Sequence, residues 1–207
     1  MNRRELLRMV ALATGGAVIG GEFLLSGCKN PKTGAGISFS ADNIAFLDEV
    51  GETIIPTTSS PGAKAAKIGD FMKVMVTDCY TEDDQKAFMA GIDQLNEASK
   101  KANGVDFMKA TPDQRKTLLT AIDKEAKEYQ KEKETKESAE RQKANKERNK
   151  VFTWQPNHYF TMMKQLTLLG YFTSEPGATK ALRYVQVPGK FEGCTEYKKG
   201  EKAWATS

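Results

Sequence analysis

Apolar residues recur along most of this 207-residue chain at intervals of three and four, which is the spacing of one face of an α-helix. Between residues 44 and 54 the spacing is set by Ile44, Leu47, Val50 and Ile54. Similar patterns follow at residues 68–76, 88–95, 118–122 and 160–170. Strand-like alternation is convincing only in the short stretch RYVQVPG at residues 183–189. The pattern predicts an all-α fold, mostly a helical single domain, with a loop-rich C-terminal segment.

Polar and turn residues mark where these helices are expected to begin and end. Ser40 and Thr81 each precede an apolar periodic stretch and are predicted N-caps, because their side chains can accept from free backbone N–H groups. Thr111 opens the sequence Thr-Pro-Asp-Gln, which places a cap, a proline and a glutamine at favourable positions. Pro56 and Gly104 are predicted to end helices.

Residues 124–150 have a different composition from the rest of the chain. Seventeen of these 27 residues are Lys, Arg or Glu, and pairs such as Glu132/Lys136 and Glu137/Arg141 lie four positions apart. Opposite charges at that spacing support a helix by a few tenths of a kcal/mol each. The composition favours a solvated helical extension, or a helix end followed by a flexible loop. An arm that contacts another molecule is the alternative.

The first 28 residues have the order of a bacterial lipoprotein signal. A basic stretch containing Arg3 and Arg4 precedes a Gly/Ala-rich apolar run, and Leu25-Ser26-Gly27-Cys28 then resembles a lipobox. We expect residues 1–27 to be removed, Cys28 to carry lipid, residues 28–39 to form a tether and residues 40–207 to form the folded domain. The alternative is a buried N-terminal helix with an isolated cysteine.

The export route is indicated by the residues around the arginine pair. The sequence NRRELLR resembles the twin-arginine pattern, whose machinery transports folded proteins. The alternative is an ordinary basic secretory signal in which two arginines occur together by chance. With the lipobox, the pattern predicts that the mature chain lies at the periplasmic face of a bacterial membrane.

With Cys28 lipidated, removal of the signal would leave two cysteines with free thiols, Cys79 and Cys194, in an oxidising compartment. An even number of cysteines outside the cytoplasm favours a disulfide. We therefore expect Cys79 and Cys194 to be joined, with two separately buried thiols as the alternative.

The side chains that carry most enzyme chemistry are scarce in this sequence. His158 is the single histidine and lies in an aromatic segment, so we expect a hydrogen-bonded packing residue. Neither C-x-x-C nor G-x-S-x-G occurs, and we predict no catalytic, cofactor-binding or metal-binding residue. Glu175 and Arg183 are expected to form a structural ion pair. The net charge of +4, without a basic patch interleaved with aromatic residues, argues against nucleic acid as a partner.

Two segments carry a resemblance to a known family. They read IIPTTSSPGAKAAKIGDFM at residues 54–72 and LTLLGYFTSEPGATKALRYVQVPGKFEGC at residues 166–194. Together they resemble the gluconate 2-dehydrogenase subunit 3 family, with similarity over most of residues 40–207. Residues 124–150 match nothing distinctive in that family, and the lipobox is a departure from its pattern.

The resemblance implies a mostly helical small subunit without catalytic residues of its own. It implies a large partner subunit of the glucose-methanol-choline type, which holds FAD, oxidises a sugar or sugar acid and passes electrons to a cytochrome c subunit or another acceptor. The small subunit would escort the flavoprotein across the membrane, and the lipid on Cys28 would anchor it there. We place the partner contact on a set of residues in the second segment: Tyr171, Phe172, Glu175, Arg183 and Tyr184.

Two other functions remain open at this point. A stand-alone periplasmic binding or structural lipoprotein would have the same leader and would exist as a monomer. An enzyme acting alone would oxidise sugars without a partner, with or without added FAD.

Overall fold

The computed structural model describes residues 37–146 and 154–187, together with residues 189, 193, 194, 196 and 198–205 near the C-terminus. The predicted signal peptide, Cys28 and the tether up to residue 36 lie outside these residues, as do residues 147–153.

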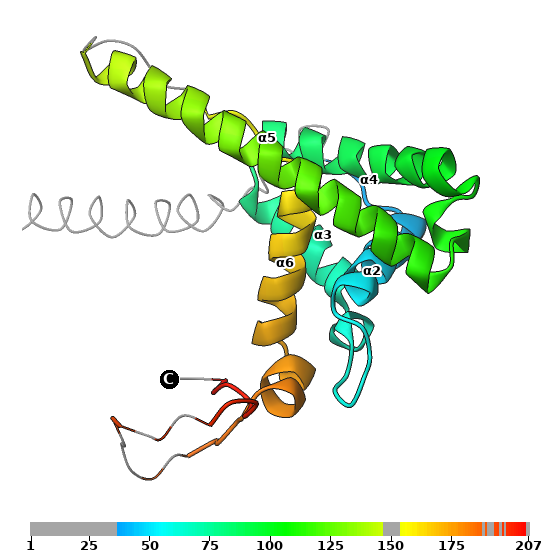
Figure 1. Ribbon diagram of the computed structural model, residues 1–207, viewed down its shortest axis with the longest axis vertical. Coiled ribbons are helices and arrows are strands. Elements are labelled where there is room, and N and C mark those ends of the chain that lie inside the picture. Colours follow the sequence, from blue (N-terminus) through cyan, green and yellow to red (C-terminus); the bar gives the residue numbers. More distant parts are fainter. Residues whose placement is uncertain are drawn as a thin grey trace, which may run out of the picture. The chain divides into compact units, whose positions relative to one another are not determined.

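The described part of the chain is all-α, as the hydrophobic pattern predicts (Figure 1). The helices are α2 (Ala41–Ile54), α3 (Ile68–Cys79), α4 (Glu82–Asn103), α5 (Pro112–Lys146) and α6 (Tyr159–Thr173), with 3₁₀ turns η1 (Ala63–Ala66) and η2 (Phe107–Lys109) and a π-helical turn η3 (Gly177–Ala181). Within the described residues the RYVQVPG stretch forms no strand, and only an isolated bridge joins Arg183 to Trp204. No described helix combines the length and apolar character needed to cross a bilayer.

The predicted helix caps are confirmed. Ser40 Oγ accepts from Asn43 N at 3.1 Å, and Thr81 Oγ1 accepts from Asp84 N at 3.3 Å. At the start of α5, Thr111 and Gln114 exchange hydrogen bonds, so both halves of a capping box are formed. Helix α4 ends at Gly104, whose φ of 73° lies in the left-handed region that glycine adopts without strain.

The start of α3 is capped from another helix, which sequence reasoning did not predict. Its N-terminal neighbour Lys67 has a left-handed backbone (φ 52°) and provides no side-chain cap. Instead Asp48 of α2 accepts a hydrogen bond from Gly69 N at 2.8 Å. The bond ties the N-terminal end of α3 to the side of α2. The two helices pack closely, because a Cβ on Gly69 would lie 2.4 Å from the backbone oxygen of Ile44.

Helix α6 is the centre of the core. It packs against α2, α3, α4 and α5 as well as against η1 and η3. Most of its circumference is covered, and its buried residues are Phe160, Met162, Met163, Leu166, Thr167, Gly170 and Tyr171. They meet apolar side chains of the other helices, among them Leu47, Met72, Phe88 and Leu119. The fold therefore depends on a helix that comes late in the chain.

A glycine allows α4 and α6 to approach each other. Gly91 is buried on α4, and a Cβ at this position would lie 2.2 Å from Cβ of Tyr159 on α6. Contacts that short do not occur between real Cβ atoms, so a larger residue at 91 would force the two helices apart.

The charged segment continues α5 without a break as far as Lys146, which confirms the predicted helical extension over those residues. In Figure 1 this second half of α5 extends beyond the helices that cover its first half. Glu132 and Lys136 form the expected pair at 3.8 Å. Glu137 pairs with Lys133, at 3.7 Å.

Residues 154–158, which we call the strap, cover one side of this extension. Lys133 Nζ donates to Asn157 Oδ1 at 2.6 Å, and Gln155 N donates to Glu137 Oε1 at 3.0 Å. Glu137 is consequently only 7% exposed, although the sequence places it in a solvated segment. The extension is therefore a helix with one side covered by the strap, to which it is hydrogen-bonded.

His158 is a hydrogen-bonded packing residue, as predicted, and it also caps α6. Its Nδ1 accepts from Phe160 N at 3.2 Å, and its ring lies 4.4 Å from that of Tyr159 and 5.6 Å from that of Tyr129. Burial lowers the pKa of His158, against the opposing effect of Glu125. The imidazole is therefore neutral at pH 7, which is the form whose Nδ1 can accept a hydrogen bond.

The predicted disulfide between Cys79 and Cys194 is wrong. Both cysteines are free and exposed. Cys79 is the last residue of α3, whereas Cys194 lies in the C-terminal segment after η3. A bridge needs Cα atoms within about 7 Å of each other. The expectation of a disulfide came from an even number of cysteines in an oxidising compartment, which contains no information on that distance.

We expect Gly91→Ala to destabilise the protein by about 1–3 kcal/mol, because the added methyl group overlaps Tyr159 at the α4–α6 contact. Gln94→Ala on the exposed side of α4 is the matched control and should change the free energy of unfolding by less than about 0.5 kcal/mol. Urea unfolding followed by circular dichroism measures both. Equal stability of the two variants would show that the helices do not meet at Gly91.

Candidate partner interface

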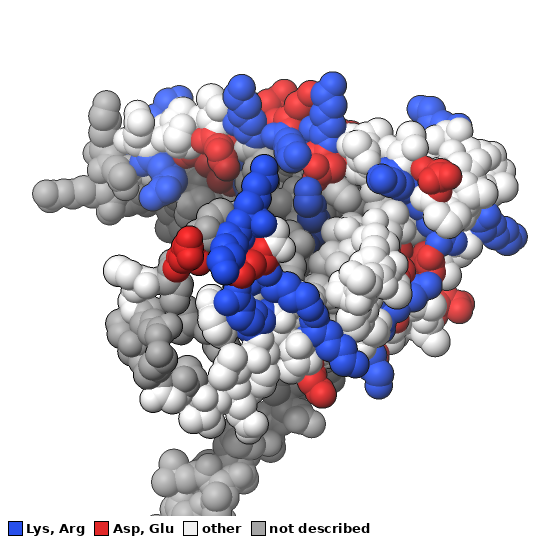
Figure 2. Space-filling model, turned by 60° about the horizontal axis from the view of Figure 1, so that its bottom comes forward, with Lys and Arg blue, Asp and Glu red and all other residues white. Residues whose placement is uncertain are grey.

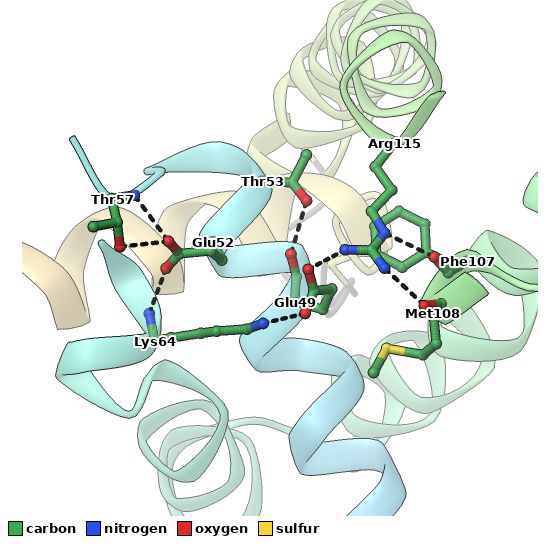
Figure 3. Close-up of polar contacts among 8 residues, drawn as sticks. All are labelled: Glu49, Glu52, Thr53, Thr57, Lys64, Phe107, Met108 and Arg115. Atoms are coloured by element: carbon green, nitrogen blue, oxygen red, sulfur yellow. Dashed lines mark hydrogen bonds and ion pairs between the residues drawn. The ribbon is translucent and has the colours of Figure 1, made fainter. Parts of the chain in front are cut away.

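The loop between α2 and η1 is organised around one carboxylate (Figure 3). Glu52 of α2 accepts hydrogen bonds from Thr57 N at 2.8 Å, Thr57 Oγ1 at 2.7 Å and Lys64 N at 3.0 Å. Gly62 lies against the same carboxylate, where a Cβ would be 2.4 Å from an oxygen of Glu52. This loop lies in the first of the two segments that carry the family resemblance, and Gly62 allows the close approach.

The hydrogen bonds also set the ionisation of Glu52. Burial by itself raises the pKa of this carboxyl, but the bonds from Lys64 N and from the side chain and backbone of Thr57 outweigh burial and leave the pKa below its ordinary value. The carboxylate is therefore the form that the folded loop stabilises.

One turn earlier on the same face of α2, Glu49 joins three parts of the fold. It pairs with Lys64 of η1 and with Arg115 of α5. Arg115 also donates to two backbone oxygens, to Phe107 at 2.9 Å and to Met108 at 2.7 Å (Figure 3). Only 12% of the Arg115 side chain and 15% of the Glu49 side chain are exposed, so this pair is largely shielded from solvent. It fixes α2, α5 and η2 relative to one another.

Tyr171 connects the first segment to the second. Its side chain is 1% exposed, and its hydroxyl donates to the backbone oxygen of Pro61. Its own backbone oxygen accepts from Ser174 Oγ at 2.6 Å, and Ser174 Oγ accepts from Gly177 N at 3.2 Å. The two segments quoted above thus meet in space. Tyr171 is one of the residues expected at the partner contact, but its side chain is buried in the core.

Helix α6 nevertheless carries an exposed apolar stripe close to Tyr171. Leu168 is 39% exposed, Leu169 48% and Phe172 42%. The three residues lie in the stretch 168–172 and fall on one side of the helix, opposite the buried face. We call them the α6 apolar face. Of the predicted contact residues, Phe172 belongs to it.

The other predicted contact residues lie after α6. Glu175 and Tyr184 are exposed. Arg183 does not pair with Glu175, contrary to expectation, and instead contacts Glu201 at 2.9 Å. Its guanidinium also stacks on the ring of Trp204, 4.6 Å from the ring centre.

The backbone around Arg183 explains this choice of partner. Arg183 N donates to Ala203 O at 2.8 Å, and Ala205 N donates to Arg183 O at 2.9 Å. These bonds bring the C-terminal residues beside Arg183. Sequence reasoning could not find the contact, because the bridge joins positions about twenty residues apart and neither stretch has the length or pattern of a strand.

Basic side chains cross the end of the domain that carries the loop and η3. Figure 2 shows that Lys and Arg run across the middle of this face, with uncharged residues around them and fewer Asp and Glu. Exposed lysines on the elements concerned include Lys64, Lys180 and Lys202. Within the described residues, no group of three or more His, Cys, Asp or Glu side chains could hold a metal ion.

A shallow hollow of about 280 Å³ lies elsewhere, between the charged half of α5 and the strap. It is lined by alternating charges, such as Lys133, Lys136, Glu137 and Glu140, together with Tyr129. Its charges largely compensate one another, and no predicted site residue lines it.

The family model of gluconate 2-dehydrogenase subunit 3 matches residues 41–189, which is most of the chain. The chain belongs to the gluconate 2-dehydrogenase subunit 3 family. The match confirms the resemblance found in the sequence and includes the loop around Glu52 and the α6 apolar face. Comparisons with curated proteins and with solved structures gave no match.

We expect Glu52→Gln to lower the stability of this subunit 3 chain at pH 7 by about 1–3 kcal/mol, since an amide cannot accept on both atoms and opposes one of the N–H donors. Because the folded pKa of Glu52 lies below its ordinary value of 4.5, its contribution is present above that pH. The contribution is lost as the pH falls through the folded pKa.

The difference in unfolding free energy between wild type and Glu52→Gln should therefore narrow as the pH is lowered from 6 to 3. Urea titrations at a series of pH values measure it. Glu97→Gln, a change of the same chemistry at an exposed position on α4, should follow the wild type. A constant difference across the pH range would contradict the assigned ionisation of Glu52.

Proposed function

We propose that this chain is the non-catalytic small subunit of a periplasmic, FAD-dependent sugar or sugar-acid dehydrogenase of the glucose-methanol-choline type, which it escorts across the membrane and anchors there. The observation that carries the proposal is the family match over residues 41–189. A subunit of a dehydrogenase implies a larger subunit that performs the oxidation, and FAD belongs to that partner. A cytochrome c subunit would accept its electrons.

The architecture of the folded domain supports a binding role. The two segments that carry the family resemblance meet where Tyr171 bonds to Pro61, and Glu52 holds the loop of the first segment that contains Pro61. The α6 apolar face lies directly beside this fixed region. A rigid surface loses little conformational entropy on association, which favours binding of a folded partner.

The leader supplies the transport and anchoring parts of the proposal. The Arg3-Arg4 pair lies in a twin-arginine-like stretch, and that route transports folded proteins. A flavoprotein that has already bound FAD could cross with this chain while lacking a signal of its own. The lipid on Cys28 would then hold both subunits at the periplasmic face of the membrane.

We expect the double change Arg3→Lys and Arg4→Lys to retain both this chain and the flavoprotein in the cytoplasm. Cell fractionation with immunoblotting follows the chain, and dye-linked dehydrogenase activity follows the partner. Arg8→Lys is the matched control, because it makes the same substitution in the same basic stretch outside the pair. Normal export of the flavoprotein with the double variant would exclude the escort role.

We expect Cys28→Ser to abolish incorporation of labelled palmitate and to release the chain into the soluble periplasmic fraction, since the acyl chains provide the anchor. Cys79→Ser and Cys194→Ser should retain the label, because those cysteines lie in the folded domain. Palmitate in the Cys28→Ser chain would show that another residue carries the lipid or that the lipobox assignment is incorrect.

A further inference from the structure

The α6 apolar face is a surface feature that the fold does not require. The core takes residues from the opposite side of α6, including Phe160, Met163 and Leu166. Single exposed leucines are common on protein surfaces, but three large apolar residues on the same side of one helix form a patch. Polar residues at 168, 169 and 172 would leave the buried face of α6 unchanged.

Helix α3 packs against α6 and carries an exposed apolar residue of its own. Phe71 of α3 packs against Gly170 of α6, so closely that a Cβ on Gly170 would lie 2.5 Å from the Phe71 ring. Val74 follows Phe71 by three positions and therefore lies on the same side of α3. It is 54% exposed. The missing side chain at Gly170 thus lets α3 and α6 approach each other closely at Phe71.

Polar residues surround these apolar groups. Lys73 precedes Val74 on α3, Gln165 precedes the stripe on α6, and Thr173 and Glu175 follow it; all four are exposed. An apolar centre with a polar rim is the usual composition of an interface between proteins that fold separately.

Phe172 packs against a buried aromatic ring at this surface. Its ring meets that of the buried Tyr171 edge to face, with ring centres 5.2 Å apart and planes at 77°. Tyr171 is itself fixed by its hydrogen bond to Pro61. Aromatic side chains that are ordered before association tend to dominate the free energy of binding, because little rotamer entropy is lost.

We propose that the α6 apolar face, Leu168, Leu169 and Phe172, forms the docking surface for the larger, flavin-bearing dehydrogenase subunit. The inference rests on the proposed function and adds the place of contact. The occupant is a protein with an apolar patch, and the lysines at this end of the domain favour acidic residues around that patch (Figure 2). The whole surface lies within the residues that match the subunit family.

The test uses the full chain with its own leader, expressed in its natural host so that its own partner is present. In the double variant Leu169→Glu/Phe172→Glu, two charges replace the centre of the patch. We expect the amount of flavin and of dye-linked dehydrogenase activity that co-purifies from detergent-solubilised membranes to fall at least about tenfold. The control is Met108→Glu, an equally exposed apolar residue on η2, which packs against α4; it should retain the partner.

A second measurement keeps the test valid if the double variant folds poorly. Circular dichroism and thermal unfolding report its helix content and stability. In parallel, a photo-crosslinking amino acid is placed at position 172 or at position 108 of the otherwise unchanged chain. Illumination should join position 172, and not position 108, to the flavin-bearing subunit.

The outcomes separate the inference from the function on which it rests. If a folded double variant retains the partner, or position 172 gives no crosslink while wild type co-purifies with a flavoprotein, the docking surface is wrong and the subunit role stands. If position 172 crosslinks a second copy of this chain, the surface is a self-association site. If wild type brings down no flavoprotein at all, the proposed function fails together with the inference.

Discussion

The burial of α6 among four other helices is the packing constraint on which the rest of the structure depends. A helix covered on most of its circumference must be apolar over most of its length and must lack bulk where its neighbours approach. Gly91 on α4 and Gly170 on α6 meet this requirement, because neither has a side chain at the points where the helices approach each other. The C-terminal end of α6 is then fixed to the loop after α2 through Tyr171 and Pro61. The same helix therefore builds the core and positions the surface beside it.

Two carboxylates on one face of α2 control the surroundings of that surface. Glu49 and Glu52 lie three positions apart, and both contact Lys64, Glu49 at the lysine side chain and Glu52 at the lysine backbone N–H (Figure 3). Glu49 is paired with Arg115 and holds helices together, whereas Glu52 is hydrogen-bonded to backbone N–H groups and holds a loop. Breaking a shielded pair such as Glu49–Arg115 leaves an uncompensated charge, which is costlier than the loss of an exposed pair. The sequence shows both as ordinary helix carboxylates.

The features predicted well from sequence are those determined within a few residues. The caps at Ser40, Thr81 and Thr111 need only a side chain and an N–H group two or three positions away, so the local sequence is sufficient. The all-α class follows for the same reason from the spacing of apolar residues. The family resemblance located the two segments that meet in space, and Phe172 was correctly expected at the surface.

The errors concern contacts between distant positions. The disulfide between Cys79 and Cys194 rests on a count of cysteines, but both are free. The ion pair between Glu175 and Arg183 rests on closeness in sequence, whereas Arg183 pairs with Glu201. Tyr171 is expected at the partner contact because it lies in the second family segment, but its side chain is buried. The strap could not be predicted, because its bonds to α5 join residues up to 27 positions apart.

The late position of α6 has a consequence for the order of events in the cell. The bond from Tyr171 to Pro61 spans 110 residues, and the pair between Arg115 and Glu49 spans 66. During synthesis α2 to α5 emerge from the ribosome first, with Phe46, Phe88 and Leu119 lacking the helix that covers them. The core closes only after residue 173 has emerged, and contacts of such long range form slowly. A chaperone would find its apolar target before that moment. Export in folded form, as in the proposed function, would require this closure to come first.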